Sequence, residues 1–233
     1  MSIAQKVAPD SIRIGANDLP IWPANQKIQG RGDKVVYMTR FSDCGEYHPG
    51  LIEKMHRLYD DPTAKRLCSV SSAGTKIHGI GDWGIPEADL INARAIAFYK
   101  KVYGHNEGYV HISWGNITRM GEYSMPHTHP DCQAVIVYML DKGESNPLDP
   151  LDGQLAFVDS RYAACCRNVP GFMTSPFMPK MQPGSMIIFP ADLVHCVNPY
   201  QGRRPRITFS WDLVPAPRGR PAVMNEIERE YGK

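Results

Sequence analysis

Three histidines and one aspartate in two short segments are the residues with the clearest chemical potential. Residues 126–131 read PHTHPD, and residues 189–195 read FPADLVH. Side chains at i and i+2 of a strand point to the same side, so the first segment could present two metal ligands together. A third ligand would come from the histidine that ends the second segment. Two imidazoles and a carboxylate on one face of Fe(II) leave the opposite positions open for O2 and an oxidisable ligand.

Two ligand sets follow from this pattern. His129, Asp131 and His195 would form the usual two-histidine, one-carboxylate set, and we expect these three residues to be both metal ligands and the catalytic centre. His127, with His129 and His195, would instead form a three-histidine site. His129 and His195 belong to both sets. The alternative without a metal is a polar turn whose histidines hydrogen-bond locally.

A strand near the C-terminus carries a cation beside a hydroxyl. Alternate side chains of residues 206–211 (RITFSW) point to opposite faces, so Arg206 and Thr208 share one face. The aliphatic and aromatic face can pack on helices, which turns the polar face toward the interior of a barrel. Burying a cation there without an anionic partner costs free energy. Arg206 with Thr208 would therefore suit a small carboxylate, and Arg204, at the same strand parity, is the second choice.

Two helices are predicted in the first half of the chain, at 48–60 and 86–103. Pro86 suits the first turn of the second helix. An apolar stripe on this helix lies opposite Arg94 and Lys101, which predicts that both cations face solvent.

A β-rich series follows the second helix. The expected strands are 109–117, 133–140, 154–158, 186–189 and 206–214, with a lead-in strand at 34–38. The polar, proline-rich connections 141–153 and 161–184 are candidate lid or substrate-facing loops. Helices followed by short strands predict a mostly β fold with flanking helices, namely a double-stranded β-helix (jelly roll, cupin-like).

Length and composition favour one domain. The 233 residues are 42% hydrophobic and 21% charged, as in ordinary globular proteins. We expect an N-terminal arm with supporting helices at 1–104, the β-helix core at 105–215 and a tail at 216–233. A net charge of +2 gives no reason to expect nucleic-acid binding. Without a long apolar run or a C-x-x-C spacing, we expect a cytoplasmic protein with free thiols and no membrane span.

Taken together, these motifs resemble the 2-oxoglutarate/Fe(II)-dependent oxygenases, and are closest to a bacterial and phage branch with a His-x-His-Pro motif. The matching elements are WGN at 114–116, HTHP at 127–130, VY at 137–138, FVDSR at 157–161, PG at 183–184, FP at 189–190, His195, and RIT at 206–208. The resemblance covers about residues 109–212. Residues 134–138 depart from it, because they read AVIVY where the branch usually reads SGVYY. The branch also often lacks an acid at the position of Asp131, which keeps His127 as a candidate ligand.

The resemblance implies an enzyme that uses Fe(II), O2 and 2-oxoglutarate as co-substrate. Such an enzyme oxidises a small molecule or side chain, usually by hydroxylation, and releases succinate and CO2. Arg206 and Thr208 would bind the far carboxylate of 2-oxoglutarate, Tyr138 would hydrogen-bond it, and Asn116 would line the same pocket. The basic loop residue Arg161 hints at an anionic substrate, and a homo-oligomer is compatible with the pattern.

Two other functions remain open from the residues alone. One is a cupin-like three-histidine metalloenzyme that does not use 2-oxoglutarate. The other is a non-catalytic jelly-roll binding module. The identity of the primary substrate, and whether it is hydroxylated, desaturated or cyclised, is not encoded in any motif found here.

Overall fold

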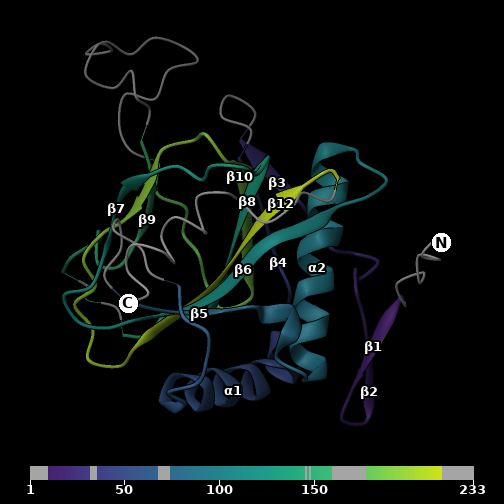
Figure 1. Cartoon of the computed structure of the whole chain (residues 1–233). Helices are drawn as coiled ribbons and strands as arrows, with labels where there is room; N and C mark the ends of the chain where they lie inside the picture. The colour runs from purple at the N-terminus through teal and green to yellow at the C-terminus, as the bar shows by residue number, and fades with distance from the viewer. Residues whose placement is uncertain are drawn as a thin grey trace.

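Two β-sheets lie against each other, and two helices cover the outer face of the larger one (Figure 1). The computed structural model describes residues 10–31, 36–67, 74–144, 146, 148–158 and 177–216. The long connection predicted at 161–184 therefore falls mostly outside the described residues, with Arg161 among those outside.

The larger sheet has seven antiparallel strands in the order β3-β4-β10-β8-β12-β6-β5. Their bounds are β3 Gln29–Arg31, β4 Val36–Arg40, β10 Ser185–Pro190, β8 Ala134–Asp141, β12 Arg206–Val214, β6 Tyr109–Thr118 and β5 Thr75–His78. The central strands β8 and β12 are almost entirely buried, as expected for strands covered on both faces.

The smaller sheet has three strands in the order β7-β11-β9, with bounds β7 Ser124–His127, β11 His195–Val197 and β9 Leu155–Phe157. A separate hairpin pairs β1 Ser11–Ile14 with β2 Asn17–Pro20. Two single-turn 3-10 helices, Cys44–Glu46 and Ile80–Asp82, complete the described elements. The facing sheets form a double-stranded β-helix with flanking helices, so the predicted fold class is confirmed.

Both helices begin and end as their sequences predict. Helix α1 spans His48–Asp60 and helix α2 spans Pro86–Tyr103, each with a proline in its first turn. Acidic residues lie in the first turn of α2 and lysines in the last, which complements the helix dipole. Gly104 then stops the helix in a left-handed conformation, with φ of 67°.

Two hydrophobic clusters fix the layers. One joins the helices to the outer face of the large sheet and includes Leu51, Phe98 and Trp211. The other fills the space between the sheets and includes Val135, Phe157 and Phe189. Alternate residues of the buried strands therefore enter different clusters, and the polar site must open at the end of the inter-sheet space.

The N-terminal segment contributes strands as well as helices. Strands β3 and β4 extend one edge of the large sheet and β5 forms the other edge. The division into three parts at residues 104 and 215 stays a prediction, and residues 217–233 of the expected tail lie outside the described part.

Arg94 is a correction to the helix prediction. It was expected on the solvent face of α2, yet it is fully buried. Its guanidinium donates to both carboxylate oxygens of Asp43, at 2.9 and 2.6 Å, and to the carbonyl of Pro20 at 2.9 Å. It also lies over the rings of Phe41 and Tyr47. A helical pattern cannot show such a distant partner, and the pairing makes burial of the charge tolerable.

This buried pair gives a stability prediction. Asp43→Ala leaves the Arg94 guanidinium buried without its anion, and we expect the free energy of unfolding to fall by about 3 kcal/mol. As a control, Asp18→Ala removes the exposed Arg13–Asp18 ion pair, and this substitution should change the free energy of unfolding by less than about 1 kcal/mol. Urea unfolding followed by circular dichroism measures both. Equal effects of the two substitutions would contradict the role assigned to the buried pair.

Cys44 and Cys196 are free thiols, as expected, and the Cys132 thiol lies 3.9 Å from the carbonyl oxygen of His129, whereas Cys68, Cys165 and Cys166 lie outside the described residues. Among the helices that the structure describes, none has the length and apolar character needed to cross a membrane.

Candidate metal centre

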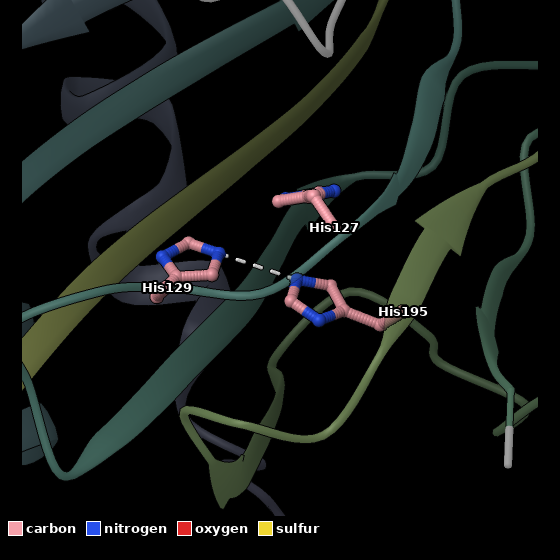
Figure 2. Close-up of side chains that lie close together, drawn as sticks. All are labelled: His127, His129 and His195. Atoms are coloured by element: carbon pink, nitrogen blue, oxygen red, sulfur yellow. Dashed lines mark hydrogen bonds between the residues drawn. The ribbon is translucent and has the colours of Figure 1, made fainter. Parts of the chain in front are cut away.

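Three histidines converge where the small sheet meets the end of the large one (Figure 2). His127 is the last residue of β7 and pairs directly with His195, the first residue of β11. His129 lies two residues beyond β7, where its backbone N–H donates to the carbonyl of Ala191 at 2.9 Å. One ring nitrogen from each histidine lies within 4.8 Å of the other two. Backbone pairing therefore brings together residues that are far apart in the sequence.

Hydrogen bonds fix which nitrogen of each ring faces the centre. The Nδ1 atoms of His127 and His195 lie 2.7 and 2.9 Å from the carbonyl oxygens of Met125 and Leu193. The Nδ1 atom of His129 lies 2.8 Å from a carboxylate oxygen of Asp212. All three partners are acceptors, so each Nδ1 carries the proton and donates it. Each Nε2 is then left with an exposed lone pair, which is the arrangement found in metal-bound histidines.

The donor set fits a metal cation. The Nε2 atoms of His129 and His195 are 3.3 Å apart (Figure 2). With both Nδ1 atoms protonated, neither Nε2 of a neutral ring has a hydrogen to donate, so two lone pairs face each other. Two imidazole nitrogens bound to one ion at about 2.1 Å and near right angles would be roughly 3.0 Å apart. A single cation between them accounts for this approach.

Burial keeps two of these rings neutral. Loss of water contact lowers the pKa of His195 to about 3, and the neighbouring His127 lowers it further. Burial also lowers the pKa of His127. Near neutral pH both rings are therefore unprotonated at Nε2, the form that binds metals.

A cavity extends from the histidines to a buried arginine. Its lining residues are Gly74, Lys76, Trp114, Asn116, Ile117, Thr118, Tyr123, Ser124, His127, His129, Val135, Val137, Leu155, His195, Val197, Arg206, Thr208 and Ser210. Three of these come from alternate positions of β12, as its sequence predicts, while Ile207, Phe209 and Trp211 pack toward the helices.

Arg206 is the cation at the far end of this cavity. Arg206 is only 4% exposed. Burial lowers the pKa of its guanidinium to about 10, and the nearby Tyr200 and Asp152 oppose this shift. It therefore stays charged at neutral pH. Among the described residues, none forms an ion pair with its guanidinium within 4.0 Å. Thr208 lies on the same face, and the Asn116 amide is 3.5 Å from its hydroxyl. A buried, unpaired cation beside a hydroxyl suits the carboxylate of a bound molecule.

Comparison with known proteins agrees with this geometry. Residues 112–212 match a protein family described as "Putative 2OG-Fe(II) oxygenase". The matched region runs through β6 to β12 and includes all three histidines and Arg206. No protein with a curated description matches the sequence.

Solved structures share the fold of this chain at low sequence identity. EctD from S. alaskensis with bound Fe is 18% identical, with a TM-score of 0.59 over 83% of this chain and 79% of that one. A Pseudomonas putida prolyl-4-hydroxylase is 15% identical, with a TM-score of 0.53 over 80% and 94%. The viral collagen prolyl hydroxylase of Paramecium Bursaria Chlorella virus-1, in its 2OG complex, is 14% identical, with a TM-score of 0.52 over 78% and 97%.

Asp131 lies apart from the cluster of His127, His129 and His195. It is exposed and sits in a turn with φ of 61°, outside the group whose ligand atoms lie close together. The expectation that His129 and Asp131 point to one side assumed a continuous strand. Strand β7 ends at His127, so the rule no longer applies at Asp131. The geometry therefore favours His127 as the third ligand of the set.

Tyr138 is also placed differently from the expectation. Its hydroxyl lies 2.8 Å from the hydroxyl of Tyr47 and 2.6 Å from Nε2 of His48, beside helix α1. The cavity is lined from β8 by Val135 and Val137, which have the opposite parity. Tyr138 therefore belongs to the core between the sheet and the helices, on the opposite face of β8 from the cavity. Asn116, by contrast, does line the cavity.

Sequence reasoning missed two charged residues of the site. Asp212 is 6% exposed and accepts the Nδ1 proton of His129. Extending the β12 alternation by two residues from Ser210 would have placed it on the cavity face. Lys76 lines the same cavity from β5, a four-residue edge strand whose sequence has no alternating pattern.

Proposed function

We propose that this chain is an Fe(II)- and 2-oxoglutarate-dependent oxygenase whose iron is held by His127, His129 and His195. Its substrate is a small molecule or a side chain, which it oxidises with release of succinate and CO2. The observation that carries the proposal is one cavity with three converging Nε2 lone pairs at one end and the unpaired Arg206 guanidinium at the other. Imidazole ligands suit iron, and a guanidinium fork suits a carboxylate.

Each residue has a distinct task in this proposal. The three imidazoles would hold the metal through their Nε2 atoms, and the co-substrate and O2 would bind beside them. Arg206 binds the far carboxylate of 2-oxoglutarate, and the Thr208 hydroxyl adds a hydrogen bond, which together orient the 2-oxo acid toward the histidines. With Fe(II) bound, O2 would be the oxidant of both 2-oxoglutarate and the substrate, while the protein orients the reactants and excludes water.

The proposal is tested by anaerobic reconstitution with Fe(II), followed by addition of 2-oxoglutarate and O2. We expect one iron per chain and Fe(II)-dependent formation of succinate. A three-histidine enzyme of another kind would bind metal without forming succinate. A binding module would fail to take up stoichiometric iron. Either result would reject the proposal.

Asp212 is the carboxylate that orients a proposed ligand. Its hydrogen bond fixes His129 in the tautomer with a free Nε2 and makes that nitrogen a stronger donor to a metal. We expect Asp212→Asn to weaken Fe(II) binding by about 10- to 100-fold. Competition with a chromophoric chelator measures the affinity, and nitrogen NMR of the apo protein reports the His129 tautomer. The control is Asp192→Asn, which changes an exposed acid near His195; equal affinities of the two variants would contradict the assignment.

A further inference from the structure

We propose that the Lys76 ammonium contacts an anionic group, a carboxylate or a phosphate, on the primary substrate. This inference rests on the proposed function and adds the chemical class of the substrate. Lys76 lies outside residues 112–212, which match the oxygenase family, so the family match does not assign it a role.

Strand pairing places Lys76 inside the cavity. Strand β5 pairs with β6 so that Lys76 lies opposite Asn116, and both line the cavity. The Lys76 ammonium lies 5.6 Å from the centre of the Trp114 ring, and that ring stacks on His129 with centroids 5.8 Å apart. Lys76 and the proposed metal ligand His129 therefore both lie beside the Trp114 ring, and all three residues line the same cavity.

Lys76 has no dedicated protein partner in the described part of the chain. No hydrogen bond or ion pair within 4.0 Å is formed by its ammonium there, apart from the contact with the Trp114 ring. Asp212 lies close enough to favour the charged form, but its carboxylate accepts the proton of His129. Burial opposes the charge and lowers the pKa of Lys76. A partly desolvated ammonium without an anion is the condition that an anionic ligand relieves.

The charges of the cavity favour an anion in addition to the co-substrate. Its lining holds two cationic side chains, Lys76 and Arg206, and no Asp or Glu among the described residues; the nearby anion is the Asp212 carboxylate, which is hydrogen-bonded to His129. A metal held by three neutral imidazoles keeps its full double charge, whereas a carboxylate ligand would reduce it. The two carboxylates of 2-oxoglutarate and the Asp212 carboxylate then balance three of the four positive charges of the metal, Lys76 and Arg206. The remainder attracts an anionic group on the substrate.

Lys76 and Arg206 are also positioned to bind different anions. Arg206 lies on β12 and pairs with Thr118, whereas Lys76 lies on β5, and strand β6 separates the two strands. One cation can therefore hold the far end of the co-substrate while the other faces a second molecule beside the metal. A solvated lysine that protects a sheet edge would extend into water. The Lys76 side chain is only partly exposed and folds over Trp114 instead.

The test uses small probes on the full chain loaded anaerobically with Mn(II) and 2-oxoglutarate. The paramagnetic metal enhances the NMR relaxation of any nearby molecule, so even weak binding is measurable. The probes are ¹³C-acetate, its neutral counterpart ¹³C-acetamide, and inorganic phosphate. The variants are Lys76→Met, Lys76→Arg and, as a control for the loss of one exposed charge near β5, Lys65→Met.

We expect saturable relaxation enhancement of acetate or phosphate, but not of acetamide, in the wild-type protein. The anion that binds more tightly identifies the group on the substrate. Lys76→Met should weaken its binding by about tenfold or more, Lys76→Arg should restore part of it, and Lys65→Met should have no effect.

The inference is overturned if acetamide binds as well as the anions, if neither anion binds, or if Lys76→Met leaves anion binding unchanged because the metal alone holds it. It is also overturned if Lys76→Met weakens the binding of 2-oxoglutarate and leaves the binding of the anionic probe unchanged. Failure of the wild-type protein to bind 2-oxoglutarate beside Mn(II) is a different result, because it rejects the proposed function itself.

Discussion

His195→Ala is expected to abolish stoichiometric iron binding and to reduce succinate formation to the background rate. His195 is 3% exposed, and its Nδ1 donates to the carbonyl of Leu193, so its Nε2 is held in place toward the other two rings. Removing it leaves two imidazoles, which cannot hold one face of an octahedral ion. His127→Ala should have the same effect if the third ligand is histidine. Iron per chain, measured after anaerobic reconstitution, checks both.

Asp131→Asn is the matched substitution for this experiment. It removes the one carboxylate that the sequence offered as a ligand, while keeping the size of the side chain. Because Asp131 is exposed and outside the histidine cluster, we expect this variant to bind iron and form succinate at the wild-type level. Loss of iron in Asp131→Asn, with retention in His127→Ala, would instead support the two-histidine, one-carboxylate set.

Arg206→Met is expected to weaken 2-oxoglutarate binding by about 100- to 1,000-fold. Truncating one partner of a buried, hydrogen-bonded charge pair costs about 2 to 5 kcal/mol, and that range includes this factor. Anaerobic titration of the Fe(II) protein, followed by visible absorption of the metal complex, measures the dissociation constant. Iron binding itself should be unchanged, because the arginine lies at the other end of the cavity.

Two controls separate this effect from damage to the fold. Arg204→Met removes a cation on the same chain segment that pairs with Asp141 and the carbonyl of Gly143, and it should leave 2-oxoglutarate affinity nearly unchanged. The ligand-free Arg206→Met protein should be at least as stable as the wild type, since it no longer buries a cation without an ion-pair partner. Tight 2-oxoglutarate binding by Arg206→Met, or its loss in Arg204→Met, would reject Arg206 as the anchor.

Local signals in the sequence were sufficient for the helices and for β12. Pro86 marks the start of α2 because its fixed φ suits the first turn, and Gly104 marks the end because glycine adopts the left-handed conformation without strain. The strict alternation of β12 separates Arg206 and Thr208 from the apolar residues between them, so the polar face could be identified without coordinates.

Strand parity was insufficient where both faces of a strand are apolar. In β8, parity correctly groups Ala134, Ile136 and Tyr138, but both faces are buried and neither is marked as polar. The choice between helix side and cavity side depends on tertiary packing. At Asp131 the rule failed for a different reason, because the backbone leaves the strand through a turn before that residue.

Long-range pairing explains the remaining differences. Arg94 is buried because Asp43, 51 residues earlier, forms an ion pair with it. Lys76 enters the cavity because β5 adds to the edge of β6, and four residues of mixed character give no sign of that pairing. Both side chains are charged, and in both the sequence indicates the charge but not its partner.

The most direct test of the three-histidine centre is a crystal structure of the full chain prepared anaerobically with Fe(II) and 2-oxoglutarate, with anomalous data at the iron edge. We predict one iron peak bound by the Nε2 atoms of His127, His129 and His195, with the far carboxylate of 2-oxoglutarate on Arg206. An iron bound through the Asp131 carboxylate, with His127 turned away, would contradict this account.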